Sequence, residues 1–394
     1  MNCVRNSAIN FLLSFLTICL LLGVLAQVDI LRSAFRPILY ISWVILLAIY
    51  IIIFRHGIIM TGQAKVLTSM AVIIFVWRII LVILGRMESF PQLGTLVLID
   101  LAAFLFGTWI ADLNAKDKTL AKIMVFYSLA VGILAIYLMI TYFPSIGAWF
   151  NSVVYQYSAK NSAAQLLAQA ILFMLFLYPS AQIKVPAVIG QIVRYGVIGI
   201  SVITIAFLRC RTAILALGVC ALYYIFRLGG KKRVIYFAVL LLLGIVVVTF
   251  APLREFVASA LLLNKYGQNS TLDQFSSGRL SYMDVAIDTW MEHFWLGVGR
   301  IMVDCNPLAL LADSGVLGAI PYYIFWLSTV KLNVFRRSSY NHFNQVIQLL
   351  TVYYCVSSLL EGYPPFGPGV CVAPMWLLSG YCEIKSEEQQ GVPI

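Results

Sequence analysis

The chain has 394 residues, of which 62% are hydrophobic and only 11% are charged. Soluble globular domains carry about 25% charged residues, so this composition excludes a soluble protein and predicts a membrane protein. The net charge of +11 could suggest nucleic-acid binding, but basic residues also orient membrane proteins, and we expect no nucleic-acid partner.

Apolar runs recur along the whole chain, each long enough to cross about 30 Å of hydrocarbon as a helix. Because lipid offers the backbone no hydrogen-bond partner, these runs are expected to be helical, and the alternating pattern of a membrane β-barrel is absent from the sequence. We therefore predict an all-α polytopic integral membrane protein. About twelve spans are expected, near residues 10–27, 38–54, 66–84, 92–110, 122–143, 162–179, 190–208, 212–227, 234–251, 307–330, 344–360 and 366–382.

The first span could be a cleaved signal peptide, but its long apolar core and weak cleavage site favour a retained anchor. With both termini in the cytoplasm, most basic residues lie inside, including the dense cluster at 227–233. This orientation places the segment 252–306 outside, where its length and aromatic content predict a folded, working loop. We expect one membrane domain over 1–394, with 252–306 as a large periplasmic loop and 383–394 as a short, solvated cytoplasmic tail.

Charges concentrate at 276–300, which reads SSGRLSYMDVAIDTWMEHFWLGVGR. A helix over 279–295 places apolar and acidic side chains on neighbouring arcs, which is typical of a helix lying along the membrane surface. The apolar arc comprises Leu280, Met283, Ile287, Trp290, Met291 and Phe294, and the acidic arc comprises Asp284, Asp288 and Glu292. A packing element with a solvated acidic face would also give this pattern. However, the acids repel one another, and Arg279 beside free N–H groups at the helix start is well placed to hold a phosphate.

Other charged residues stand at or inside predicted spans. Arg209 and Arg211 lie where an outside turn meets a span, and they either reach for lipid headgroups or bind a phosphate. Arg78 and Asp100 lie inside the third and fourth spans, where we expect them to pair with each other. Close helix packing at Gly315 and Gly318 would explain the motif around them, but Asp313, about two turns into the tenth apolar run, is harder to explain by packing alone.

The sequence predicts neither a metal nor a cofactor. Its three histidines form no ligand cluster, its eight cysteines contain no CxxC pair, and no P-loop is present.

Several motifs follow one another in a fixed order. They are Asn161 in SAKNSAAQLL, CRTA at 210–213, SGRL at 277–280, Trp290, LGVGR at 296–300 and CNPLALLADSGVLGA at 305–319. Their order and the predicted topology resemble the O-antigen polymerase and O-antigen ligase superfamily. Members of that superfamily share twelve spans, a long outside loop between spans nine and ten, and an HNxxLxxLxExGxxG motif entering the tenth span. The resemblance covers residues 161–319, and the first 140 residues or so match only in hydropathy.

The resemblance implies that a sugar hydroxyl attacks the anomeric carbon of an undecaprenyl-pyrophosphate-linked glycan, and that undecaprenyl pyrophosphate leaves. It implies that Arg211 and Arg279 bind the pyrophosphate, and we add Arg209 and Arg300 as further candidates, with Lys160, Asn161 and Asn306 in support. A carboxylate would accept the hydroxyl proton. The candidates are Asp304, which we favour, and also Asp288, Glu292, Asp313 and His293.

Ligases of this superfamily are expected to have histidine where this chain has Cys305, so the polymerase branch is favoured. The alternatives are an O-antigen ligase that transfers glycan to lipid A-core, and a flippase or other transporter. The expected partners are a lipid-linked oligosaccharide donor and acceptor, membrane lipids, and a chain-length regulator and flippase of the same pathway. The expected location is the bacterial inner membrane.

Overall fold

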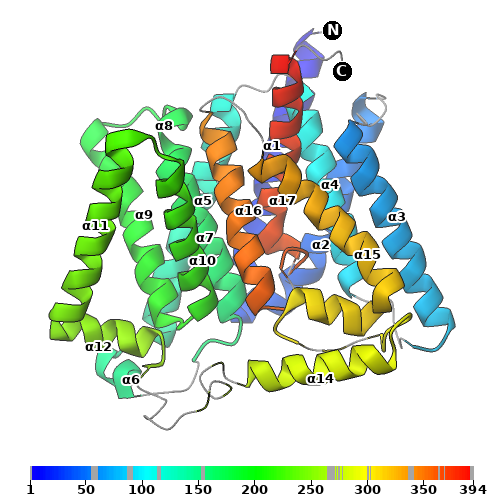
Figure 1. Ribbon diagram of the computed structural model, residues 1–394. Coiled ribbons are helices and arrows are strands. Elements are labelled where there is room, and N and C mark those ends of the chain that lie inside the picture. The colour runs from blue at the N-terminus through cyan, green and yellow to red at the C-terminus, as the bar shows by residue number, and fades with distance from the viewer. Residues whose placement is uncertain are drawn as a thin grey trace.

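Figure 1 shows the computed structural model of the chain. The structure describes residues 2–54, 61–86, 92–112, 117–151, 156–263, 271, 273, 276, 278–299, 301, 303–335, 341–362, 364–367 and 369–390. Throughout these ranges the regular elements are helices and none is a strand, which confirms the predicted all-α class.

Each predicted span coincides with a long helix in the described part of the chain. These helices are α1 (Asn2–Leu25), α2 (Asp29–Phe54), α3 (Gly62–Ile83), α4 (Gln92–Asp112), α5 (Asp117–Tyr142), α7 (Lys160–Phe176), α9 (Ala187–Phe207), α10 (Arg211–Arg227), α11 (Gly230–Thr249), α15 (Asn306–Val334), α16 (His342–Leu360) and α17 (Gly369–Gln390). Seven described helices, namely α2, α3, α5, α9, α11, α15 and α16, are long and apolar enough to cross a membrane. The protein is therefore a multi-pass membrane protein.

Short helices occupy the connections: α6 (Ile146–Asn151), α8 (Tyr178–Ala181), α12 (Ala251–Ala260) and α14 (Arg279–Glu292). Helices α6, α12 and α14 lie at one end of the bundle, and both chain termini lie at the other (Figure 1). We refer to the first as the α14 end. The predicted loop 252–306 thus does carry helices, and α14 runs across the ends of the long helices as a surface helix would (Figure 1).

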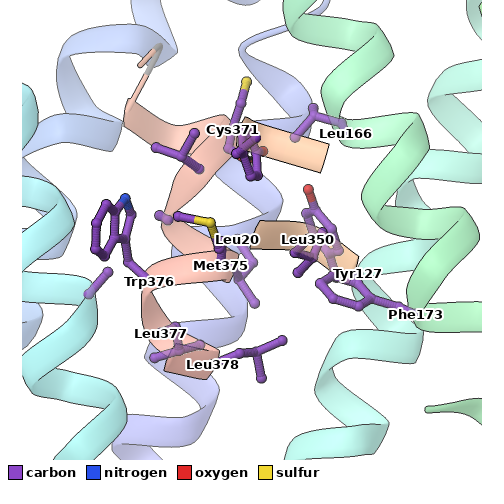
Figure 2. Close-up of a cluster of buried hydrophobic side chains, with 14 of the residues drawn as sticks. Leu20, Tyr127, Leu166, Phe173, Leu350, Cys371, Met375, Trp376, Leu377 and Leu378 are labelled. Atoms are coloured by element: carbon purple, nitrogen blue, oxygen red, sulfur yellow. Dashed lines mark hydrogen bonds between the residues drawn. The ribbon is translucent and has the colours of Figure 1, made fainter. Parts of the chain in front are cut away.

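Helix α17 lies at the centre of the bundle (Figure 1). Figure 2 shows its side chains beside Leu20 of α1, Tyr127 of α5, Phe173 of α7 and Leu350 of α16. These apolar side chains belong to one continuous core that extends from α1 to α17. The first helix therefore packs as part of the bundle.

Helices α4 and α17 cross at unusually short range. A Cβ placed on Gly107 would lie 2.0 Å from the carbonyl oxygen of Leu377, and one on Gly380 would lie 2.0 Å from that of Phe104. Only glycine allows two helix backbones to approach this closely, and such contacts hold membrane helices together without a hydrophobic driving force.

The expected solvation of the tail at 383–394 is wrong for its first two residues. Helix α17 continues to Gln390, and Glu383 and Ile384 are buried against the bundle. The first two residues of this polar segment therefore still belong to the core.

Candidate active site

Four helices begin with residues that the sequence analysis singled out. Lys160 is the first residue of α7, Arg211 of α10, Arg279 of α14 and Asn306 of α15. Each helix start carries the positive end of a helix dipole, and three of the four also carry a basic side chain. An anion near these helix starts would be stabilised by both.

An open ion pair joins Arg279 to Asp304. The Nε of Arg279 donates to Oδ2 of Asp304 over 3.0 Å, and the two side chains are 20% and 53% exposed. A solvated pair of this kind contributes about 1 kcal/mol or less to stability. Arg279 can therefore exchange the carboxylate for a phosphate at small cost, and a guanidinium binds phosphate through two parallel hydrogen bonds.

The first turn of α14 is capped by the chain itself. Asp273 accepts a hydrogen bond from the N–H of Ser281 over 2.9 Å and one from its hydroxyl over 2.7 Å, and Ser276 Oγ accepts from the N–H of Leu280 over 3.3 Å. The bonds from Ser281 lower the pKa of Asp273. The expectation of free N–H groups at this helix start is wrong for these two amides, because the chain's own oxygens already occupy them. A phosphate would be bound here by the Arg279 side chain.

Next to the ion pair lies a carboxylate that the sequence analysis did not single out. Glu361 follows the last residue of α16 and is only 6% exposed. Nε2 of Gln165 lies 3.4 Å from its Oε2, and the Thr212 side chain also hydrogen-bonds to it. Burial raises the pKa of Glu361 to about 7; Arg279 opposes this shift and Asp304 adds to it. A carboxyl group with this pKa gains and loses its proton near neutral pH, as a general acid or base must.

The turn after α16 is held against the start of α15. Nδ2 of Asn306 donates to the carbonyl of Gly362 over 2.9 Å. A Cβ on Gly362 would lie 2.3 Å from the carbonyl oxygen of Val303, so glycine is required for this approach. Because Val303 and Asn306 flank Asp304 in the sequence, the contact brings Asp304 and Glu361 together from two separate connections.

The residue before α10 links it to α7. Sγ of Cys210 lies 3.5 Å from Oδ1 of Asn161, and Lys160, Arg279 and Glu361 all act electrostatically on the Cys210 thiol. Charged groups from α7, α14 and the end of α16 are thus concentrated around the start of α10.

Arg211 lies between two residues that interact with Glu361. Cys210 precedes it, Thr212 follows it, and Arg211 itself is partly exposed. The structure thus brings together most of the predicted supporting and pyrophosphate-binding residues. The resulting cluster, which we call the Glu361 cluster, comprises Lys160, Asn161, Gln165, Arg211, Thr212, Arg279, Asp304, Asn306 and Glu361.

Arg209 is in a different environment. Its side chain is 3% exposed, its guanidinium lies 4.7 Å from the centre of the Trp149 ring, and it donates to the Trp149 carbonyl. Trp149 in turn packs against Phe207 and Phe256. These contacts make Arg209 an anchor for α6, which carries Trp149.

The predicted pairing of Arg78 with Asp100 is wrong. Nη2 of Arg78 lies 2.5 Å from Oδ2 of Asp313, and its Nε donates to the hydroxyl of Tyr322 over 3.1 Å. The reason is geometric, since the face of α3 that carries Arg78 packs against α15. Asp313 is therefore held in a buried ion pair. Both carboxylate oxygens of Asp100 are buried without a hydrogen-bond partner among the described residues.

The glycines of LGVG and DSG have a structural role. Helix α15 is interrupted at Gly315, where φ is +63°. The segment 296–299 lies against this interruption, and the N–H of Gly299 donates to the carbonyl of Asp313 over 2.8 Å. A Cβ on Gly315 would lie 2.2 Å from the carbonyl oxygen of Trp295. The two motifs therefore fasten the end of α14 to α15.

The remaining predicted candidates lie away from the Glu361 cluster. Asp288, Glu292 and His293 are on or just after α14, and a rise of 1.5 Å per residue puts Asp288 about 14 Å and Glu292 about 20 Å from Arg279 along the helix. Asp288 and Glu292 are exposed, and His293 follows the last residue of the helix. Arg300 lies outside the described residues.

Helix α14 packs on α15 through a narrower face than predicted. Ala286 is buried, and it clusters with Met283, Trp290, Cys305 and Ala309. The other members of the predicted apolar arc, Leu280, Ile287, Met291 and Phe294, are exposed. Cys305, at the position of the ligase histidine, thus lies in this apolar cluster.

Sequence reasoning missed Glu361, Gln165, Thr212 and Asp273. For Glu361 a signal was present, since it is the only charge in the short turn between the spans predicted at 344–360 and 366–382. Gln165 and Thr212 lie inside the motifs SAKNSAAQLL and CRTA, but only the fold shows that both of them meet Glu361.

Comparison with known protein families gives a match at residues 196–323 to the family model described as O-antigen ligase. The matched segment contains Arg211, Arg279, Asp304 and Asn306, and it ends before Glu361. No curated protein matches the chain. This match, over about a third of the chain, supports the resemblance to the O-antigen polymerase and ligase superfamily.

Proposed function

We propose that the protein is a polymerase of O-antigen or a related surface polysaccharide. It would transfer an undecaprenyl-pyrophosphate-linked glycan onto a lipid-linked repeat unit on the periplasmic side of the bacterial inner membrane. The observation that carries the proposal is the Glu361 cluster, in which three helices begin with basic residues and one of these, Arg279, lies beside two carboxylates at the end of a membrane bundle.

The basic residues of the cluster suit a pyrophosphate. Arg279 and Arg211 would hold the leaving group, and Lys160 would add a third positive charge. As the bond to the anomeric carbon breaks, negative charge grows on the departing pyrophosphate. Fixed cationic donors at that position stabilise the transition state by about 3–4 kcal/mol each.

The position of the cluster suits a lipid-linked substrate. It lies at the ends of long apolar helices, where a polyprenyl tail can remain in the hydrocarbon while its pyrophosphate reaches polar surroundings. The same geometry admits a second lipid-linked glycan as the acceptor. Both substrates of a polymerase are of this kind.

An O-antigen ligase is the second candidate, because the matching family model carries that description. A ligase would use the same arginines to move glycan onto lipid A-core. The residue at position 305 supports the polymerase instead, since ligases are expected to have histidine there, whereas this chain has Cys305 in an apolar cluster with Ala286 and Ala309.

A test in cells separates these activities. A deletion strain would be complemented with the wild-type chain or with Arg279→Ala, and its lipopolysaccharide analysed on a gel. The proposal predicts that deletion leaves core with a single repeat, that wild type restores the ladder and that Arg279→Ala does not. Bare core with long lipid-linked polymer would show a ligase, and bare core with cytoplasmic single units would show a flippase.

A further inference from the structure

Five groups were predicted to accept the proton of the acceptor hydroxyl, and their environments differ. Asp313 is occupied by Arg78 in a buried pair. Asp288, Glu292 and His293 are about 14 Å or more from Arg279 along α14. Asp304 is in place, but it is bound to Arg279 and 53% exposed, as in an ordinary solvated ion pair.

Glu361 has the properties that these candidates lack. It belongs to the same cluster as Arg279, it is 6% exposed, and Gln165 and Thr212 hold its carboxylate from α7 and α10. A general base needs a fixed position and a proton affinity suited to neutral pH, and partial removal from water provides both.

A second observation indicates a binding position beside Glu361. Oε1 of Gln165 is buried and has no hydrogen-bond partner among the described residues, although Nε2 of the same amide faces Glu361. A buried acceptor without a donor is destabilising, and such atoms usually have a partner. A sugar hydroxyl is a donor of the required kind, and one placed there would lie next to the Glu361 carboxylate.

We propose that Glu361 is the general base that takes the proton from the acceptor sugar hydroxyl; this rests on the function proposed above. The hydroxyl oxygen bonds to the anomeric carbon of the donor, whose bond to the pyrophosphate oxygen breaks. The electron pair leaves with undecaprenyl pyrophosphate, which Arg279 and Arg211 hold. The hydroxyl proton passes to Glu361 and then to water.

The proposal predicts a pH dependence with a definite sign. Burial raises the pKa of Glu361 to about 7, so the carboxyl is protonated and inactive below that pH and charged and active above it. The rate should therefore rise with pH through about 7. The charged and titratable groups that act on this site from the surrounding elements are Lys160 (α7), Cys210 (before α10), Arg279 (α14), Asp304 (before α15), Tyr353 and Tyr354 (α16) and Cys371 (α17).

The test uses the full chain purified into lipid nanodiscs. The substrate is the undecaprenyl-pyrophosphate-linked single repeat unit extracted from cells that lack this chain, and the rate of polymer formation is followed from about pH 5.5 to 8.5. Glu361→Gln should lower kcat by about 100-fold or more and abolish the rise with pH, while KM changes little. Glu361→Asp should recover part of the rate. Glu255→Gln, an exposed glutamate of α12, is the matched control and should behave as wild type.

A Glu361→Gln enzyme with the wild-type rate and pH profile would overturn the proposal. If that variant does not fold, a flat wild-type profile across the same pH range would overturn it, and a rise through about pH 7 that Glu361→Asp shifts would support it. If the wild type transfers glycan only to lipid A-core, polymerase is the wrong function, and the same variants decide the role of Glu361 on that acceptor. Transfer to neither acceptor would overturn both proposals.

Discussion

The chain contains two arginine–aspartate pairs whose surroundings are opposite. Arg78 and Asp313 lie 2.5 Å apart, with side chains 0% and 6% exposed, and Tyr322 completes the hydrogen bonding of the guanidinium. Arg279 and Asp304 lie 3.0 Å apart with side chains 20% and 53% exposed, close to a third carboxylate. The first pair holds α3 to α15, and the second is open to exchange. Burial and the number of satisfied bonds, more than residue type, separate a structural ion pair from a binding site.

The largest expected effect comes from breaking the buried pair. Arg78→Met would leave Asp313 charged and unpaired in the bundle, which costs about 3–5 kcal/mol of stability. We expect little folded protein in detergent, as measured by fluorescence-detected size exclusion and by Tm.

The double variant Arg78→Met, Asp313→Leu is the control, because replacing both charges by apolar side chains is often neutral. It should recover folding. If Arg78→Met is instead stable but inactive, the buried pair has a functional role, and the proposed difference between the two pairs is wrong.

Removing Arg279 from the solvated pair should have the opposite effect, because activity should be lost while the protein stays folded. Arg279→Ala loses a pyrophosphate ligand, so the polymerisation rate should fall by about 100- to 1,000-fold. The free energy of unfolding should change by less than about 1 kcal/mol, because the pair is solvated. The exposed Arg254 of α12 is the matched control, and Arg254→Ala should retain activity. A destabilised but active Arg279→Ala enzyme would contradict the assignment.

Asp304→Asn tests whether Asp304 only pairs with Arg279 or also accepts the proton of the acceptor hydroxyl. If Asp304 only neutralises Arg279 in the absence of substrate, its loss should strengthen substrate binding and change kcat by about tenfold or less. Steady-state kinetics on the lipid-linked repeat unit would measure both. A fall in kcat of about 100-fold or more would show that Asp304 accepts the proton.

Asp273→Ala tests how the first turn of α14 positions Arg279. Loss of this cap should destabilise the turn by about 1 kcal/mol and lower the rate several-fold. Hydrogen exchange should accelerate at the amides of Leu280 and Ser281, whereas the middle of α14 around Ala286 should be unaffected. Unchanged exchange at the first turn would show that Asp273 does not support it.

The smallest effect is expected at Cys305. Because its thiol lies in the apolar cluster beneath α14, Cys305→Ala should leave the rate within about twofold of wild type, a change in barrier below about 0.5 kcal/mol. A loss of about 100-fold would show that this position takes part in the chemistry, as its histidine is expected to do in ligases.

Much of the fold could be predicted from the sequence, because hydrophobic runs alone define membrane helices. All predicted spans correspond to helices, and the surface helix was placed within a few residues. The partner of Arg78 could not be predicted, since it depends on which helix faces α3. The start of the segment 383–394 was taken for a solvated tail because it is polar, although Glu383 and Ile384 are buried at the end of α17.

The candidate site was only partly predictable. Arg211 and Arg279 stand out in the sequence because the first lies where an outside turn meets a span and the second lies at the start of a predicted surface helix, and Lys160 was expected to support them. The role of Asp273 depends on the conformation of the loop before α14, and that of Glu361 on the turn at Gly362 that meets Val303. Contacts between separate connections leave no local pattern in the sequence, so only the structure reveals them.

The central claim is that lipid-linked glycans are joined at the Glu361 cluster. Its most direct test is mass spectrometry of the products formed when purified protein in nanodiscs receives only undecaprenyl-pyrophosphate-linked single repeat units. The account predicts undecaprenyl pyrophosphate carrying two, three and more repeats, one free undecaprenyl pyrophosphate for each bond formed, and neither product from Arg279→Ala. Unchanged single units after incubation with folded wild-type protein, or equal product from Arg279→Ala, would contradict it.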